Sequence, residues 1–410
     1  MSPGKLAIQT YNSIAQLEGI RGQWEDLLAA YPLATTFSTP EWLLPWWRNF
    51  GQSQELLVVA AFADASLAGL AALSFTSVRM AGSIPLRVLR LMGDGSHDSD
   101  NLDIPVRPGF EDSFAHLLVE VIEKHRSRWD VGYLNSVPPQ STSIDAVRRV
   151  LEQRKSVMFE GRTPASAIAL PETWEQYLKQ LSSKERGKIG LRARRLEKKY
   201  AVRIRRCEDE QELDPLLQVL YDLHGKHWQA RGLPGTLHVP ARRRFYSELA
   251  VLLLRRRRLD FWILEADGKV VAAQFGLRHG TTVFSLQEGF DTEYASDSVG
   301  YVLRSQVIKE LLAQGIRRYD FLGGADESKK RWGADVGHYL NVSFARPWSK
   351  GAAYLKTLHH ARQGKSWLRE HVSASTWELL HNVNVRLKGE GRKPLQGGQP
   401  SLGDRTDDPQ

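Results

Sequence analysis

The chain has 410 residues, of which 42% are hydrophobic and 25% are charged, and its formal net charge is +9. This length suits two domains of ordinary size plus a tail, and the composition is that of an ordinary soluble protein. The lone Cys207 excludes an internal disulfide framework and a cysteine metal cluster, and no stretch reaches the roughly 18 apolar residues of a transmembrane helix. We therefore expect a cytoplasmic protein with no signal peptide and no bound metal.

The net charge bears on the partners of the chain. A basic surface attracts phosphates by Coulomb attraction, so nucleic acid, anionic lipid and phosphorylated cofactors such as coenzyme A are all admissible. The alternative is a solvated basic surface that binds no specific partner.

Residues 1–160 predict a first domain in which helices precede a meander of strands. A strand is expected at 6–10, apolar residues at helical spacing predict a helix across 14–28, and Thr39 followed by Pro40 predicts the start of another helix. The pattern then predicts strands at 56–62, 67–78 and 85–92, a helix at 110–126, a strand at 131–135 and a helix at 143–153.

Two side-chain groups in this half invite a functional interpretation. Aromatic rings bury large areas, so we expect the tryptophans after Thr39 in the core rather than on a sugar-binding platform: Trp42, Trp46 and Trp47. Four titratable residues share a polar loop at 93–109: His97, Asp98, Asp100 and Asp103. That loop either lines the space between the domains or is a flexible surface loop, which is the more common case.

Residues 161–347 repeat the pattern of the first half. Strands are expected at 165–170, 202–206, 259–266, 270–277, 282–288, 318–322 and 340–345, and helices at 173–200 with a break near Ser182, at 210–231, at 241–254 and at 299–314. The Asp267-Gly268 pair predicts a tight hairpin turn. The fold class is therefore α/β (α+β), with two similar domains that each contain a mixed sheet flanked by helices. Residues 348–410 predict a basic helical segment followed by a disordered tail from about residue 389.

The segment from Ser285 to Leu303 predicts a strand, a polar loop and a helix. The strand ends near Glu288, Ser298 is a suitable N-cap, and Gly300 would let a ligand approach the backbone closely. The first backbone N–H groups of such a helix carry partial positive charge and suit a pyrophosphate. The alternative is an ordinary capped helix.

The segment from Tyr319 to Trp332 predicts a second site element. A strand delivers Asp320, Gly323-Gly324 allows a sharp turn, and Lys329 follows. Ligands of open α/β sheets bind beyond the carboxyl ends of strands, where a lysine can hold a phosphate or a developing negative charge. The alternative is a solvated basic loop.

These segments together resemble the GNAT-superfamily acyltransferases of the CelD-like family, which act in cellulose and exopolysaccharide biosynthesis and are related to the FemABX aminoacyl transferases. The matching pieces are the Asp267-Gly268 hairpin, Gly289-Phe-Asp291, Ser298-x-Gly300-x-x-Leu303, Gly315-x-x-x-Tyr-Asp-Phe321, Lys329-x-x-Trp332, Phe37-Ser-x-Pro-x-Trp42 and Leu181-Ser-x-Lys-x-Arg186. The family usually has a tyrosine where this chain has Ser328, which puts a role for a phenol there in doubt.

The resemblance implies two tandem GNAT-like domains, with an acyl donor such as acetyl-CoA in the second. Carried over, four residues at the start of the helix would meet the pyrophosphate of the donor: Ser298, Val299, Gly300 and Tyr301. Lys329 would lie near the reacting centre. Glu288 and Asp320 are the candidate bases for the acceptor, a small molecule or glycan with a free amine or hydroxyl.

Two other functions stay open at this point. One is an aminoacyl-transfer-RNA-dependent transferase of FemABX type, which would use the basic helix at 184–199 to bind RNA; a solvated helix face is the alternative for that helix. The other is an inactive GNAT-like scaffold in polysaccharide biosynthesis. His224 and His227 share a helix face, but no further ligand has clear spacing, so we expect a polar face rather than a metal site.

Overall fold

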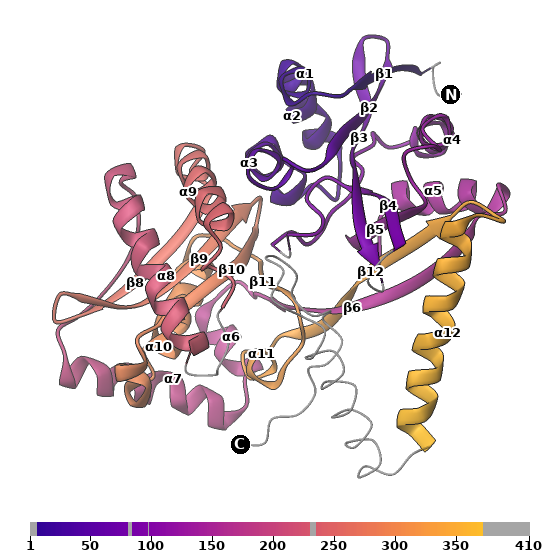
Figure 1. The fold of residues 1–410 in the computed structure, drawn as a ribbon. Coiled ribbons are helices and arrows are strands. Elements are labelled where there is room, and N and C mark those ends of the chain that lie inside the picture. The colour runs from indigo at the N-terminus through magenta and orange to yellow at the C-terminus, as the bar shows by residue number, and fades with distance from the viewer. Residues whose placement is uncertain (1–5, 81–83, 97, 230–234, 372–410) are drawn as a thin grey trace. The chain divides into compact units, whose positions relative to one another are not determined.

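The computed structural model describes residues 6–80, 84–96, 98–229 and 235–371 (Figure 1). His97 and the expected disordered tail lie outside these ranges. The chain divides into two units, residues 1–355 and 356–410, and the sheet described below belongs to the first. No helix in the described ranges is long and apolar enough to cross a membrane.

One mixed sheet runs through the whole of the first unit. Its order is β1-β2-β3-β4-β5-β12-β6-β11-β10-β9-β8-β7. The strands are β1 (Ala7–Tyr11), β2 (Glu55–Ala63), β3 (Ser66–Met80), β4 (Ile84–Leu91), β5 (Val131–Val137), β6 (Val157–Ala169), β7 (Val202–Arg206), β8 (Leu259–Ala266), β9 (Lys269–His279), β10 (Thr282–Phe290), β11 (Arg318–Gly323) and β12 (Asp335–Ala345).

The helices precede and interrupt the strands in each half. They are α1 (Ile14–Gly19), α2 (Arg21–Ala30), α3 (Pro40–Phe50), α4 (Glu111–Lys124), α5 (Thr142–Gln153), α6 (Trp174–Gln180), α7 (Ser183–Lys199), α8 (Leu213–Gln229), α9 (Pro240–Arg255), α10 (Val299–Ala313), α11 (Glu327–Lys330) and α12 (Lys350–His371). The break expected near Ser182 is confirmed: Ser182 caps α7, and its side chain accepts a hydrogen bond from the Glu185 N–H.

Each half contains an antiparallel meander that ends in a parallel pair. In the first half, β4 pairs parallel with β5, and in the second half β10 pairs parallel with β11. A helix connects the two strands of each pair, α4 in the first half and α10 in the second (Figure 1). The α/β class with two similar halves, expected from the order of elements, is therefore confirmed.

The two halves share strands rather than meeting at a simple boundary. Strand β12, the last of the chain, lies between β5 of the first half and β6, and β6 in turn pairs with β11 of the second half. The predicted boundary at residue 160 lies inside β6. Strands β6 and β12 also begin well before the predicted residues 165 and 340, because their first parts are exposed and lack the alternating apolar residues that reveal a strand.

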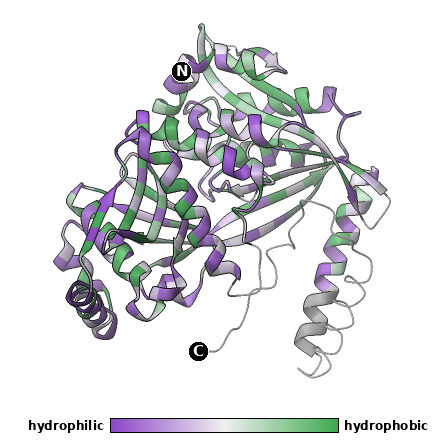
Figure 2. Ribbon diagram, turned by 60° about the vertical axis from the view of Figure 1, so that its left-hand side comes forward, coloured by the Kyte–Doolittle hydropathy of each residue, from purple (hydrophilic) through white to green (hydrophobic). Residues whose placement is uncertain are grey.

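Alternate residues of the central strands face two separate cores in the second half. On β8, Phe261 and Ile263 belong to the core under α8 and α9, whereas Trp262 and Leu264 belong to the core under α10 and α7. This two-sided burial is the mark of a sheet that carries helices on both faces. Figure 2 shows hydrophobic residues along the strands and hydrophilic residues on the outer sides of the helices.

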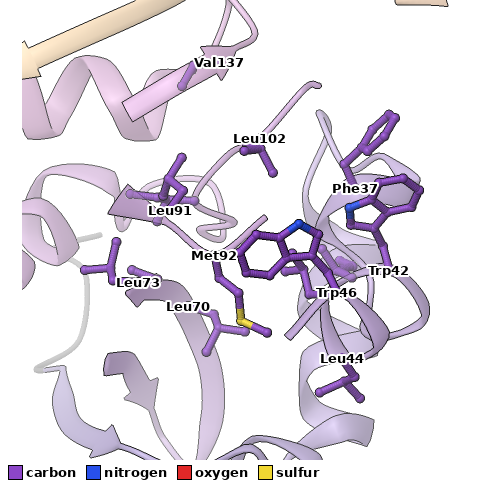
Figure 3. Close-up of a cluster of buried hydrophobic side chains, with 14 of the residues drawn as sticks. Phe37, Trp42, Leu44, Trp46, Leu70, Leu73, Leu91, Met92, Leu102 and Val137 are labelled. Atoms are coloured by element: carbon purple, nitrogen blue, oxygen red, sulfur yellow. The ribbon is translucent and has the colours of Figure 1, made fainter. Parts of the chain in front are cut away.

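Two of the three tryptophans of α3 lie in the core, as expected, whereas Trp47 is only partly buried against it. Trp42 and Trp46 are at most 1% exposed and lie among aliphatic and aromatic side chains, with Phe37 beside Trp42 (Figure 3). Their indole N–H groups donate to the hydroxyls of Ser99 and Ser96, at 3.0 and 2.8 Å. Both serines belong to the polar loop after β4, so the core tryptophans also hold that loop.

A buried network fixes the far end of the same loop. The Asp103 carboxylate accepts hydrogen bonds from the phenol of Tyr31, from the Ser141 hydroxyl at 2.6 Å and from the Ile104 N–H at 2.8 Å. Burial raises the pKa of Asp103 to about 6, although the bonds from Ser141 and Tyr31 oppose that shift.

The raised pKa of Asp103 predicts that its contribution to the free energy of unfolding falls as the pH rises. The folded state keeps the Asp103 proton up to about pH 6, whereas the unfolded chain releases it near about pH 4, so its contribution is complete below about pH 4 and is lost through about pH 6. Two pKa units correspond to about 3 kcal/mol, which partial exposure reduces to about 2 kcal/mol. Urea unfolding of wild type and Asp103→Asn should show the difference in unfolding free energy shifting by that amount, in favour of the variant, between pH 4 and 7. A difference that is constant with pH would contradict the assignment.

Candidate active site

The parallel pairing of β10 with β11 stops while both strands continue. It runs from Thr282↔Arg318 to Phe284↔Asp320. Beyond that point β10 stays with β9 as far as Phe290, and β11 stays with β6 as far as Gly323. We call this point the fork. The carboxyl ends of parallel strands are where open α/β sheets bind ligands.

The backbone of β11 bends at the fork. Leu322 has φ +63°, a left-handed conformation that is unusual for a leucine, and the register with β6 shifts between Asp320 and Gly323. The equivalent strand of the first half has the same feature, since Ser136 of β5 has φ +54°. Such irregular residues at the end of a strand persist only where surrounding contacts hold them.

Asp320 supplies those contacts. Its side chain is 5% exposed; one carboxylate oxygen accepts from the Leu322 N–H at 2.8 Å, and the other accepts from Nε and Nη2 of Arg318 at 3.1 and 3.0 Å. Burial raises the pKa of Asp320, and the charge of Arg318 opposes that shift. The arrangement makes Asp320 a group that holds the bend in β11.

Glu288, the other predicted base, lies on the β10 side of the fork. Its carboxylate is 55% exposed and forms an ion pair with Arg304 of α10. The Arg304 guanidinium lies 5.4 Å from the ring centre of Phe321 and 5.6 Å from that of Trp332. Arg304 therefore bridges the two sides of the fork, because Phe321 belongs to β11 and Glu288 to β10.

Lys329 points back towards the end of β11. Its ammonium donates to the carbonyls of Gly323 at 2.8 Å and Gly324 at 3.1 Å, and burial lowers its pKa. Gly324 has φ +93°, and a Cβ there would lie 3.2 Å from the Lys329 nitrogen, so the turn needs glycine. The alternative of a solvated basic loop describes the neighbouring Lys330, which pairs with Glu327 in solvent, but not Lys329.

A residue from the first half completes the fork. The Asp100 carboxylate accepts from the Gly323 N–H at 2.9 Å, and the charges of Lys329 and Asp320 both act on it. Burial raises the pKa of Asp100. The sequence placed Asp100 in a loop without assigning it to a site, and the flexible surface loop favoured there is wrong.

The loop is held by a buried ion pair with the second half. Asp98 is 5% exposed, and its carboxylate accepts from Nε of Arg242 at 2.8 Å and from the phenol of Tyr246 at 3.2 Å. That phenol accepts in turn from the Gln287 amide of β10 at 2.9 Å. Hydrogen bonds therefore connect the loop to both strands of the fork.

The predicted anion-binding helix begins beside the fork. Ser298 occupies the N-cap of α10, but its backbone is left-handed, with φ +57°, and its side chain makes no capping bond, contrary to expectation. Val299 is fully buried. A Cβ on Gly300 would come within 3.4 Å of Phe290, which is ordinary contact, so the protein itself has room for a methyl group there.

The side chain of Tyr301 is held by contacts within the protein. Its ring lies 4.4 Å from that of Trp332, centre to centre, and its hydroxyl donates to the Glu185 carbonyl at 3.4 Å. The first N–H groups of α10 have no acceptor within the helix, and no acidic residue stands in its first turn. The start of α10 is thus suited to an anion through its backbone rather than through the side chains of Ser298 and Tyr301.

Of the two histidines of α8, the structure describes the side chain of His224. His224 is buried, and its Nε2 accepts from the Trp228 indole at 2.9 Å; the side chain of His227 lies outside the description. Within the described ranges, no group of three or more His, Cys, Asp or Glu side chains is arranged to hold a metal ion.

Comparison with known proteins identifies the class of this site. Residues 183–330, which include α7, the fork, α10 and Lys329, match the acetyltransferase (GNAT) domain family. This part of the chain is similar to the GNAT acetyltransferases. A comparison with curated proteins finds no sequence match.

Two solved structures are similar to this chain in architecture. FemX aligns with a TM-score of 0.57 at 11% identity, over 82% of this chain and 96% of FemX. A conserved protein of unknown function from Bacteroides thetaiotaomicron aligns with a TM-score of 0.51 at 15% identity, over 79% of this chain and 97% of that one. At these identities the likeness concerns the fold, and it includes both halves.

The buried ion pair gives a prediction about how the loop is held. Arg242→Met leaves the Asp98 carboxylate buried without its partner, which should lower the unfolding free energy by about 3 kcal/mol. Adding Asp98→Asn should restore more than half of that loss, because no uncompensated charge then remains. Urea unfolding measures both effects, with the exposed Arg244→Met as control, expected within about 0.5 kcal/mol of wild type. A double variant as unstable as Arg242→Met would contradict the pairing.

Proposed function

We propose that this protein transfers an acyl group from acyl-CoA, such as acetyl-CoA, to an amine or hydroxyl of a small molecule or glycan. The observation that carries the proposal is the fork itself: the start of α10 lies beside the end of β10 that has separated from β11, and Asp100 and Lys329 lie at the end of β11. An anion-binding helix and an acid–base group at neighbouring strand ends are what acyl transfer requires.

The donor would bind at the start of α10. The N–H groups of Val299, Gly300 and Tyr301, with Ser298 at the cap, would hold its pyrophosphate. A helix of 15 residues is long enough to develop the whole partial positive charge that a helix N-terminus carries. Gly300 fits this role because its missing Cβ lets a phosphate approach the backbone. The acyl chain would then lie along β10, with its carbonyl carbon near the fork.

Lys329 and Asp100 would act on the reacting atoms. The acceptor nitrogen or oxygen attacks the thioester carbonyl, an oxyanion forms, and the coenzyme A thiolate leaves. Lys329 places a positive charge where the oxyanion develops. Asp100 would take the acceptor proton, because the residue is half-buried rather than fully buried and the raised pKa of its carboxyl makes it a better base than an ordinary aspartate.

The other two carboxylates suit different roles. Asp320 would position β11, because both its oxygens are already bonded within the strand. Glu288 is the second candidate base; it is more exposed than Asp100, but it is paired with Arg304. Mutation distinguishes these assignments.

The first half lacks the features that suit a donor site. Its corresponding helix, α4, begins with Glu111 and Asp112, whose charges would repel a pyrophosphate. The loop that follows β4 contacts the second half, through Asp98 with Arg242 and Asp100 with Gly323. We therefore place a single donor site in the second half, with the first half contributing Asp100.

The acceptor and the pathway remain proposals drawn from resemblance. The CelD-like motifs favour an acceptor in polysaccharide or envelope metabolism, and the single cysteine fits a cytoplasmic enzyme. An aminoacyl-transfer-RNA donor is the second candidate, favoured by an architecture like that of FemX. An inactive scaffold is the third.

Gly300 gives a direct test of the donor site. Gly300→Ala should weaken acetyl-CoA binding about tenfold in calorimetry, because the added methyl group would displace the phosphate from the backbone. Gly187→Ala in α7 is the matched control, since a Cβ there meets nothing within 4 Å, the Cβ at Gly300 makes only ordinary contact with Phe290, and both variants gain the same helix propensity. Equal affinity for all three proteins would remove α10 from the donor site, and failure of wild type to bind any acyl-CoA would favour the RNA-dependent or scaffold alternatives.

The base is tested by three isosteric variants. Asp100→Asn should lower kcat by a factor of about 100 or more while the KM for the acyl donor changes little. Wild-type kcat/KM should rise with pH through the Asp100 pKa, and that rise should vanish in Asp100→Asn. Asp103→Asn, in the same loop but away from the fork, serves as control. If Glu288→Gln loses kcat instead and Asp100→Asn does not, the base is Glu288.

A further inference from the structure

A chain of cation–π and ring contacts runs from the fork to the surface of α7. Arg304 lies over the Trp332 ring, Trp332 lies 4.4 Å from Tyr301, and the Arg192 guanidinium lies 4.3 Å from the centre of the Tyr301 ring. Arg192 belongs to α7, and Tyr301 to the first turn of α10. The contacts therefore fix one arginine of α7 beside the start of the proposed donor helix.

Arg192 is part of a basic strip on α7. Residues at positions i, i+4, i+7 and i+11 lie on one side of a helix, and this strip, which we call the basic flank, consists of Lys188, Arg192, Arg195 and Lys199. Two of its cations are neutralised, Lys188 by Glu185 at 2.6 Å and Lys199 by Asp297 at 2.9 Å. Arg192 and Arg195 form no ion pair with any carboxylate in the described part of the chain.

A third cation approaches the same place from another element. The positive charge of Arg331, which follows α11, acts on the Tyr301 phenol together with that of Arg192. Glu185 is the carboxylate that faces this phenol, and it is already bonded to Lys188. The start of α10 is thus flanked by arginines from two elements, and these have no carboxylate partner among the described residues.

We propose that Arg192, assisted by Arg195 and Arg331, binds the phosphorylated ribose of the donor, the 3′-phosphoadenosine end of coenzyme A. This inference rests on the proposed function, because it assumes that the pyrophosphate lies at the start of α10. An arginine whose planar group is held on an aromatic ring keeps its N–H edge free for bidentate contact with a phosphate.

The same geometry favours a nucleotide over RNA. The basic flank is about 16 Å long, as the helical rise over eleven residues gives, and half of its charge is neutralised. Binding of a nucleic acid backbone depends on many phosphate contacts along an extended surface. Two or three free arginines beside one helix start suit one additional phosphate.

The experiment compares two ligands that differ by that phosphate. Coenzyme A and 3′-dephospho-coenzyme A are titrated into the full-length protein by calorimetry, with wild type, Arg192→Gln and Arg194→Gln. Arg194 is the matched control, because it is exposed, lies on the opposite side of α7 and loses the same charge. Wild type should bind coenzyme A about tenfold more tightly than the dephospho form, as one charge-assisted contact implies.

The variants separate the phosphate contact from general weakening. Arg192→Gln should lose the tenfold preference and bind 3′-dephospho-coenzyme A as wild type does, which also shows that the donor site is still folded. Arg194→Gln should keep the preference. Equal affinity of wild type for the two ligands overturns the inference and leaves the donor site in place.

Two other outcomes contradict more than the phosphate contact of Arg192. If wild type binds neither ligand, both the inference and the coenzyme-A-dependent function fail. If transfer RNA binds instead, and Arg192→Gln and Arg194→Gln weaken it equally, α7 is a nucleic acid surface and the specific role of Arg192 is wrong.

Discussion

One antiparallel ladder, that of β6 with β12, is the constraint on which the candidate site depends. It joins eleven residue pairs, from Asp335↔Ala167 to Ala345↔Val157. Within the described residues, the sheet passes from β5 through β12 and β6 to β11, so this ladder connects the strands of the two halves. Because β12 arrives last in the chain yet lies in the middle of the sheet, neither half can complete its sheet without the other. A loop of the first half can therefore take a fixed position at the fork of the second.

Paired charges give the fork its geometry more than its stability. Asp98 with Arg242, Asp320 with Arg318 and Glu288 with Arg304 are each placed where β-strands end or helices begin. Removing two charges from water offsets most of their attraction, so such pairs add little net stability, but breaking one leaves a buried charge that is strongly unfavourable. The same asymmetry keeps each side chain in one place, which a reaction centre needs.

Local signals predicted the elements of the site well. The turn at Asp267-Gly268 has two residues with positive φ, as such a hairpin requires. Glu288, Asp320 and Lys329 do lie around one strand fork, and Ser298 does stand at the N-cap of α10, because strand ends and helix starts depend on neighbouring residues. The side chain of Ser298 does not cap the helix, since a short 3-10 turn before it imposes a left-handed backbone that composition does not reveal.

The features of the fold and the site that the sequence did not predict depend on contacts between residues that are far apart in the chain. Asp100 lies 223 positions from Gly323, so nothing near either residue announces their hydrogen bond. The early parts of β6 and β12 are exposed and lack the apolar alternation by which a strand is predicted. The sequence left a solvated basic loop open as the alternative for Lys329, because the turn at Gly323-Gly324 that directs its ammonium towards β11 is visible only in the structure.

The two halves have the same topology but have diverged in what they do with it. Both contain a parallel pair, a connecting helix and a left-handed residue near the end of the second strand. In the second half the connecting helix begins without acidic residues and beside free arginines, whereas in the first it begins with Glu111 and Asp112. The first half instead uses the segment after β4 to carry Asp98 and Asp100 across to its neighbour. Under the proposed function, two similar halves divide one reaction between them: the second half would hold the donor, and the first would supply an acid–base group. The shared sheet fixes the distance between these two parts of the site.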